Sequence, residues 1–269
     1  MTQPPWTEAI KPHQPSVARI YDLFLGGKDN FASDRAAAEA IKEKVPYFQP
    51  TVRENRRFLQ RAVRFLTDAG VRQILDIGTG LPTAGNVHEI ASQARVVYVD
   101  YDPIVVHHAN ALLATETDRV RVVAGDARWP NNILTHPDVR NFLEWREPIG
   151  LLMVGLLHFV TDDDGAHDIV EQFKAALAPG SYLVISHGTY DYNPPAEWVQ
   201  TVQDQYRPSN AEPFMRPKEQ VELFFAGCDM VEPGLVNATQ WRPDGESEGL
   251  PPEQIALYGG VGRIRADVW

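Results

Sequence analysis

Between residues 71 and 187, short apolar runs rich in β-branched residues alternate with longer runs whose apolar residues recur at helical spacing. The short runs predict strands and the longer runs predict crossover helices. Such alternation builds a parallel sheet, because each helix returns the chain to the edge where the previous strand began. The pattern therefore predicts an α/β fold with a doubly wound, mostly parallel sheet. We expect strands near 71–76, 95–100, 120–124, 149–154 and 181–187, and helices near 84–92, 103–114, 132–144 and 164–178.

The chain before this alternation is predicted to be helical. Ser16 can cap a helix that runs to about Leu25, and further helices are expected near 33–43 and 51–69. Prolines are expected to break the chain at Pro46 and Pro50. The first 15 residues hold four prolines and are expected to be extended or mobile.

The chain after residue 187 changes pattern again. Two helices are expected near 194–206 and 217–227, followed by strands near 230–237 and 256–264 that would form a hairpin at the sheet edge. The whole pattern predicts a helical cap or lid segment over residues 1–70 and a ligand-binding domain over residues 71–269.

Three successive predicted strands end in an acid, namely Asp76, Asp100 and Asp126. Because the carboxyl ends of parallel strands meet at one edge, these acids should line one pocket. The first acid precedes the turn Gly78-Thr79-Gly80, where glycine lets the backbone approach a ligand closely. The helix that follows is expected to point free N–H groups at a ligand carboxylate. Asp100 follows the turn by 20 residues, where an acid accepts hydrogen bonds from ribose hydroxyls.

The first acid discriminates between adenosine ligands. A dinucleotide would bring a pyrophosphate to this turn, where the Asp76 carboxylate would repel it. S-adenosylmethionine brings an ammonium and a sulfonium, which suit a carboxylate. Thr83 also stands where a dinucleotide fingerprint has its third glycine. In this pocket, Asp126 would accept from the adenine amino group and the Ala127 N–H would lie beside the ring.

Composition excludes several other classes of protein. The net charge of −11 argues against nonspecific nucleic-acid binding. The single cysteine, Cys228, excludes an intramolecular disulfide and is expected to be a buried thiol in a cytoplasmic protein. No metal-binding motif is present, and residues 149–160, the longest apolar run, are too few to span a membrane. The densest basic cluster is expected to be a solvated or ion-paired helix face, and comprises Arg53, Arg56, Arg57, Arg61 and Arg64.

Beyond these patterns, the chain resembles a known family. The strand-end motifs at 76–80, 99–100 and 125–127 are similar to those of class I S-adenosylmethionine-dependent methyltransferases. The segments at 18–31 and 81–89 resemble an actinobacterial methyltransferase family of poorly defined function, formerly a domain of unknown function. This resemblance covers nearly the whole chain. It implies a Rossmann-like, seven-stranded sheet whose last strand is antiparallel, and S-adenosyl-L-methionine as cofactor.

The N-terminal helices have an expected role within this resemblance. In related methyltransferases, helices before the sheet cover the methionine end of the cofactor, so Tyr21, Gly27 and Asn30 should contribute to a lid. The alternative is that Tyr21 packs on the first strand and the glycines only end a helix. Cofactor binding is thus expected from Tyr21, Gly27, Asn30, Asp76, Gly78, Thr79, Gly80, Asp100, Tyr101, Asp126, Ala127 and Leu156.

The acceptor side of the site is less defined. His158, in the turn after the fourth strand, is the first candidate for a general base, and His187, after the fifth strand, is the second. Trp198 and Trp241 could wall an acceptor pocket or simply pack in the core. No Asn-Pro-Pro-Tyr motif follows the fourth strand, which disfavours nucleobase or glutamine amide acceptors. Together with the net acidity, this favours a small-molecule acceptor.

Two alternatives remain open from the sequence. One is a sensor or pseudoenzyme that binds S-adenosylmethionine without transferring its methyl group. The other is an NAD-dependent oxidoreductase, which Asp76 and the absence of a Tyr-x-x-x-Lys pair disfavour.

Overall fold

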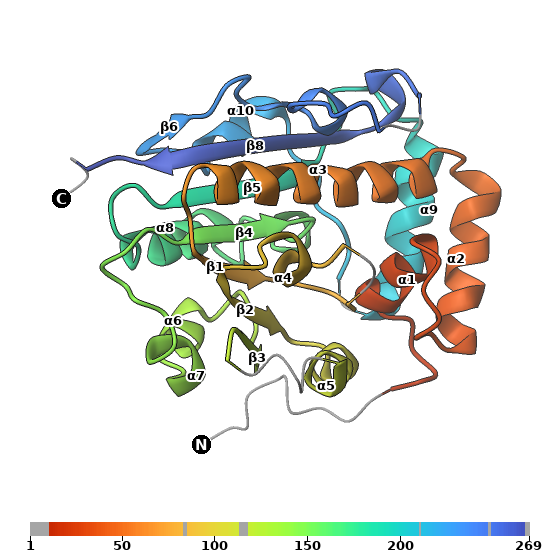
Figure 1. The fold of residues 1–269 in the computed structure, drawn as a ribbon. Coiled ribbons are helices and arrows are strands. Elements are labelled where there is room, and N and C mark those ends of the chain that lie inside the picture. Colours follow the sequence, from red (N-terminus) through yellow and green to blue (C-terminus); the bar gives the residue numbers. More distant parts are fainter. Residues whose placement is uncertain (1–10, 83–84, 113–117, 210, 247–248, 267–269) are drawn as a thin grey trace.

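The computed structural model describes residues 11–82, 85–112, 118–209, 211–246 and 249–266 (Figure 1). The expectations for residues 1–10, for Thr83, and for the predicted helix ends at residues 84, 113 and 114 lie outside the described residues. In the described part, no helix combines the length and apolar character needed to cross a membrane.

The centre of the fold is an eight-stranded sheet with the order β3-β2-β1-β4-β5-β8-β6, and β7 also pairs with β8. Strands β1 to β5 are mutually parallel, and β8 runs antiparallel to β5. The predicted α/β fold with a mostly parallel sheet is confirmed. The strands are β1 (Gln73–Ile77), β2 (Arg95–Asp100), β3 (Val120–Ala124), β4 (Gly150–Val154), β5 (Tyr182–Gly188), β6 (Cys228–Met230), β7 (Val236–Asn237) and β8 (Leu257–Ile264).

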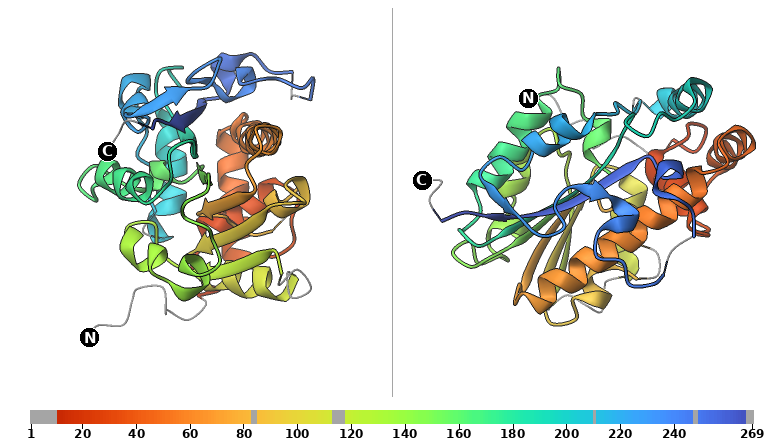
Figure 2. Two further views of the ribbon diagram at one scale, coloured as in Figure 1. Left: turned by 60° about the vertical axis from the view of Figure 1, so that its left-hand side comes forward. Right: turned by 90° about the horizontal axis from the view of Figure 1, so that it is seen from above.

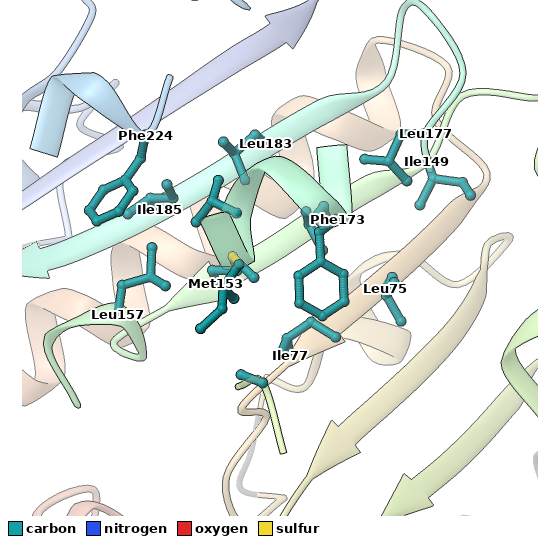
Figure 3. Packing of buried hydrophobic residues seen from close by; sticks show 14 of the residues in the cluster. Leu75, Ile77, Ile149, Met153, Leu157, Phe173, Leu177, Leu183, Ile185 and Phe224 are labelled. Carbon is teal, nitrogen blue, oxygen red and sulfur yellow. The ribbon is translucent and has the colours of Figure 1, made fainter. Parts of the chain in front are cut away.

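Alternation along the strands separates two hydrophobic layers. Leu75 and Val97 face one layer, whereas their neighbours Ile74 and Val96 face the other. The first layer, shown in Figure 3, packs against α6 (Pro130–Leu134), α7 (Pro137–Arg140), α8 (Ala166–Ala175) and α10 (Lys218–Leu223). The second packs against α3 (Phe48–Asp68), α4 (Val87–Ile90) and α5 (Pro103–Leu112). Figure 2 shows the orange α3 and the green α8 on opposite sides of the sheet.

A third group of helices lies beyond the carboxyl ends of the parallel strands. It contains α1 (Val17–Phe24), α2 (Ala32–Lys44) and α9 (Ala196–Tyr206), which share a separate hydrophobic cluster (Figure 1). Short 3-10 turns complete the chain at η2 (Leu157–Phe159), η3 (Arg207–Ser209), η4 (Ala238–Gln240) and η5 (Pro252–Gln254). This third group covers the edge at which the predicted pocket should lie.

Three expectations about local structure were wrong. Pro50 lies in the first turn of α3 and does not interrupt it, because an N–H in that turn has no intrahelical partner to lose. The helix expected over 132–144 is divided into α6 and α7, since the residue before Pro137 is disfavoured in helical geometry. The strand expected over 230–237 is two short strands, β6 and β7, and each pairs antiparallel with β8, as expected for a hairpin at the sheet edge.

The helix starts also differ from expectation. Ser16 precedes α1, yet its hydroxyl donates to Asp102 Oδ2 at 2.6 Å and does not cap α1. Asp102 caps α5, as its Oδ1 accepts from the Ile104 N–H at 2.9 Å. Its two carboxylate oxygens therefore join the start of α1 to the start of α5.

Candidate functional site

A cavity of about 410 Å³ lies at the carboxyl ends of β1, β2 and β4, beneath α1 and α9. The predicted cofactor residues that line it are Tyr21, Asp76, Gly78, Thr79, Gly80, Asp100, Tyr101 and Leu156. These residues lie far apart in the sequence, and the parallel sheet brings the two strand-end acids to one edge. The predicted Gly27, Asn30, Asp126 and Ala127 lie outside this lining.

The turn after β1 depends on two glycines in left-handed conformation. Gly78 has φ 73° and Gly80 has φ 67°, a region that other residues enter at a cost. A Cβ on Gly78 would lie 2.7 Å from Leu156 Cδ1, so this glycine allows the turns after β1 and β4 to pack together. A Cβ on Gly80 would meet nothing within 4 Å. Gly80 therefore presents bare backbone to the cavity.

Asp76 is a buried carboxylate at the end of the cavity formed by this turn. Its Oδ2 accepts from Thr79 Oγ1 at 3.0 Å. Burial raises the pKa of Asp76 to about 7, against the smaller lowering effects of Thr79 and of the Arg56 charge. A ligand cation beside this group would favour its charged form. The Asp76 carboxylate therefore fits the ammonium and sulfonium of S-adenosylmethionine.

Asp100 fixes the geometry of the same turn. Its Oδ2 accepts from the Gly80 N–H and its Oδ1 from the Asp102 N–H, both at 2.9 Å. Burial raises the pKa of Asp100 to about 6, although these N–H groups act in the opposite direction. The carboxylate thus ties the end of β2 to the glycine turn of β1, and it lines the cavity where a ribose was expected.

The helix that follows the glycine turn is short, and its N-terminus is capped. The helix α4 is only four residues long and begins at Val87. The N–H groups of Gly85 and Asn86 donate to Glu89 Oε2 at 2.8 and 3.0 Å. The capping carboxylate thus occupies these two N–H groups, and contact between the start of this helix and a ligand carboxylate stays a prediction.

The third strand-end acid is engaged in a local ion pair. Both Asp126 oxygens accept from Arg128, with Oδ2 2.6 Å from its Nη2. Ala127 is buried in the layer beneath. Both residues lie outside the cavity lining, and contact between Asp126 and adenine stays a prediction.

The lid residues expected near the N-terminus behave differently from one another. Tyr21 lines the cavity, and its hydroxyl accepts from Asn55 Nδ2 at 2.9 Å and donates to Val52 O at 3.3 Å. Asn55 Oδ1 in turn accepts from Ser186 Oγ at 2.5 Å, and that Oγ accepts from the Gly155 N–H. This chain of hydrogen bonds joins α1 and α3 to the turn after β4. Sequence patterns gave no signal for Asn55 or Ser186.

Gly27 and Asn30 have structural contacts in the same segment. A Cβ on Gly27 would lie only 2.0 Å from the buried Asp22 carboxylate. Asn30 donates to Gly27 O at 3.3 Å and accepts from Arg35. These contacts shape the loop between α1 and α2, and a role in cofactor binding stays a prediction for both residues.

His158 lines the cavity in the turn η2. Burial and the nearby Arg216 guanidinium lower the pKa of His158 to about 4, so the imidazole is neutral near pH 7. Its Nδ1 is buried and has no hydrogen-bond partner among the described residues. His158 thus lines the cavity as a neutral and weakly basic group, and its contact with an acceptor stays a prediction.

His187 lies next to His158, with ring centroids 5.6 Å apart, but it is outside the cavity lining. It is fully buried, its Nδ1 donates to Gly188 O at 2.7 Å, and its Nε2 accepts from Arg216 at 2.9 Å. Since guanidinium only donates and the carbonyl only accepts, these partners fix the neutral tautomer. This geometry suits holding Arg216 better than accepting a proton from a substrate.

Arg216 is a residue that the sequence analysis missed. It is fully buried and donates to Leu157 O at 3.0 Å, Val160 O at 2.9 Å and Asp162 Oδ1 at 2.6 Å. These bonds pin the turn that carries His158. No sequence signal indicated this role, because Arg216 stands between Met215 and Pro217 just before the charged residues Lys218 and Glu219.

The two tryptophans and the arginine cluster singled out from the sequence differ in where the fold places them. Trp198 lines the cavity, whereas Trp241 is fully buried in the core between α3 and the sheet. Arg61 is buried and donates to Trp241 O and Ala238 O, while Arg57 pairs with Glu54 at 2.7 Å. The arginine cluster is therefore structural in large part. Cys228 is buried, as expected.

Comparison with known proteins places these features in a family. The S-adenosyl methyltransferase family model matches residues 4–265. A candidate methyltransferase from Thermobifida fusca YX is 41% identical, with 94% of this chain and 96% of that chain covered and a TM-score of 0.87. A DUF574 family protein from Streptomyces avermitilis is 40% identical, with 93% and 98% covered and a TM-score of 0.88.

A more distant structure shares the fold alone. An O-methyltransferase family protein from Burkholderia thailandensis is 14% identical, with 95% of this chain and 65% of that chain covered and a TM-score of 0.53. No curated protein matches the chain. On the strength of the match over residues 4–265, this chain belongs to the S-adenosyl methyltransferase family.

Proposed function

We propose that this protein binds S-adenosylmethionine in the 410 Å³ cavity and transfers its methyl group to a small-molecule acceptor bound in the same cavity. The observation that carries the proposal is the composition of the lining. Two buried acids and a glycine turn lie at the β1 and β2 end, and aromatic and aliphatic side chains from α3, α9 and η2 line the rest. One chamber thus offers both a cation-binding end and an apolar end.

Each end has a distinct task in this proposal. Asp76 attracts the cationic part of the cofactor, Asp100 accepts from its ribose, and Gly80 allows close backbone approach. The bound cofactor supplies a methyl group that its sulfonium already activates. The protein then needs mainly to orient the acceptor and exclude water.

His158 is the first candidate to contact the acceptor, since it lines the cavity at the turn after β4. With its pKa lowered to about 4, it would serve as a hydrogen-bond partner or a weak base. An acceptor that needs a strong base for deprotonation fits this site poorly.

Calorimetry with S-adenosylmethionine, S-adenosylhomocysteine and NAD tests the proposal. Both sulfur ligands should bind and NAD should not. Asp76→Asn and Asp100→Asn should each weaken binding of S-adenosylmethionine at least tenfold, because each removes a buried negative charge. The exposed Asp163→Asn is the matched control and should bind normally. Folded wild-type protein that binds neither sulfur ligand would refute the proposal.

A further inference from the structure

Aromatic rings from several elements line the cavity in two contacting groups. The ring centroids of Phe48 and Tyr206 are 6.4 Å apart, those of Tyr206 and Phe159 are 5.8 Å apart, and Phe159 lies 4.3 Å from the His158 ring. Tyr47 and Trp198 form a second edge-on pair at 5.6 Å. All of these residues line the cavity. The aromatic wall is defined here as Tyr47, Phe48, Phe159, Trp198 and Tyr206.

Apart from Tyr47, the side chains of the aromatic wall are held in place by the hydrophobic cluster of the helices α1, α2 and α9. Tyr206 is almost fully buried, and Phe48 packs on Phe24 with ring centroids 5.0 Å apart. The cluster that joins α1, α2 and α9 also includes Phe159 and Trp198 among its partly buried members. Because these side chains are held by the fold, a ligand that binds them loses little additional side-chain freedom of the protein.

Charge is confined to other parts of the lining. Among the described lining residues, the charged side chains are Arg56, Asp76, Asp100, Asp102 and Glu253. Arg56 donates to Asn86 beside the β1 turn, and the three aspartates belong to the cofactor end. Glu253 is exposed on η5. An anionic group at the aromatic wall would therefore leave water without a cationic lining residue beside it and would meet the negative faces of the rings, which is costly.

These observations narrow the chemical class of the methyl acceptor. Resting on the methyl-transfer function proposed above, we propose that the aromatic wall binds the methyl acceptor and selects an aromatic molecule that carries no negative charge. A flat ring can make offset or edge-on contacts with several of these side chains at once, and such contacts are more favourable than aliphatic contacts of equal area. An aliphatic or anionic acceptor gains neither ring contacts nor a charged partner at this wall.

Calorimetry on the protein saturated with S-adenosylhomocysteine tests this selectivity. The probes are 2-naphthol, its saturated counterpart decahydro-2-naphthol, and the anionic 2-naphthyl phosphate. We expect 2-naphthol to bind at least tenfold more tightly than either of the other two. Equal or tighter binding of the saturated or the anionic probe would overturn the proposal, as would no binding of any probe.

Variants locate the binding and separate the two proposals. Trp198→Leu should weaken 2-naphthol binding at least fivefold and leave the affinity for S-adenosylhomocysteine within twofold. The matched control is Trp145→Leu, at a partly buried tryptophan that donates to Arg140 O and lies outside the cavity lining. It should change neither affinity. Unchanged 2-naphthol binding in Trp198→Leu would overturn the acceptor proposal alone, whereas absent S-adenosylhomocysteine binding in wild type would overturn the proposed function as well.

Discussion

Arg216 Nη1 lies 2.9 Å from His187 Nε2, with both side chains fully buried. The same guanidinium donates to the carbonyls of Leu157 and Val160 on either side of His158. One buried cation thus holds the turn after β4 against the end of β5, and the candidate acceptor-side histidine depends on it for position.

Arg216→Met is expected to destabilise the protein by about 3–5 kcal/mol, because it removes the donors to His187 and to two buried carbonyls. Urea denaturation measures the change. Arg207→Met is the control, since Arg207 is exposed and its loss should leave the denaturation midpoint nearly unchanged. Equal effects of the two substitutions would show that the buried contacts of Arg216 contribute little.

Asp76→Asn is expected to stabilise the cofactor-free protein by about 1–3 kcal/mol above pH 7, because the pKa of this buried acid is raised. An acid whose folded pKa exceeds its unfolded pKa destabilises the fold as it ionises. The gain should therefore be full above pH 7, shrink as pH falls, and vanish below about pH 3, where Asp76 is protonated in both states. Thermal denaturation of both proteins at pH 4.5 and pH 8 checks this, and a pH-independent difference would contradict it.

Cofactor affinity should fall as pH decreases through about 7, because protonated Asp76 no longer attracts the ligand cation. The proposed site predicts that S-adenosylmethionine binds roughly five- to tenfold more weakly at pH 6 than at pH 7.5. Calorimetry at the two pH values measures this ratio. Asp76→Asn should show a much smaller pH dependence, and a wild-type affinity that is flat across this range would exclude the role given to Asp76.

Gly78→Ala should destabilise the protein by about 2–4 kcal/mol, since its Cβ would clash with Leu156 and its φ is positive. Gly80→Ala should cost only about 1 kcal/mol, because its Cβ would meet open space. Denaturant midpoints of both variants provide the comparison. Adding Leu156→Ala to Gly78→Ala should recover part of the loss, and the absence of any recovery would point to backbone strain alone.

Tyr21→Phe should destabilise the protein by about 1 kcal/mol, because Asn55 Nδ2 loses the hydroxyl that accepts its hydrogen bond. If that hydroxyl only holds the lid, affinity for S-adenosylmethionine should change less than threefold. Paired denaturation and calorimetry separate the two effects. A much larger loss of affinity than of stability would instead assign the hydroxyl to cofactor contact.

Local pattern was enough for the framework of the fold. The parallel strands were predicted to within about two residues, because a strand buried on both faces reads as a short apolar run between turns. The placement of Asp76, Asp100 and the glycine turn around one cavity also followed from sequence, since parallel strands must end at one edge.

Spacing in the sequence could not assign the side chains that act through distant partners. His187 was the second candidate base after His158, until the fold placed Arg216 against it, 29 residues further along the chain. Trp198 and Trp241 were likewise indistinguishable, yet one lines the cavity and the other fills the core.

The sequence by itself determined which runs of the chain form strands, where each strand ends and which acid stands at that end. Only the tertiary structure decided that β8 inserts between β5 and β6, that Asp126 pairs with Arg128, and that an aromatic wall faces the cavity. The physical reason is the separation along the chain of the residues that determine each property. Backbone periodicity is a local property of neighbouring residues, whereas burial, charge pairing and ring contacts depend on segments that only folding brings together.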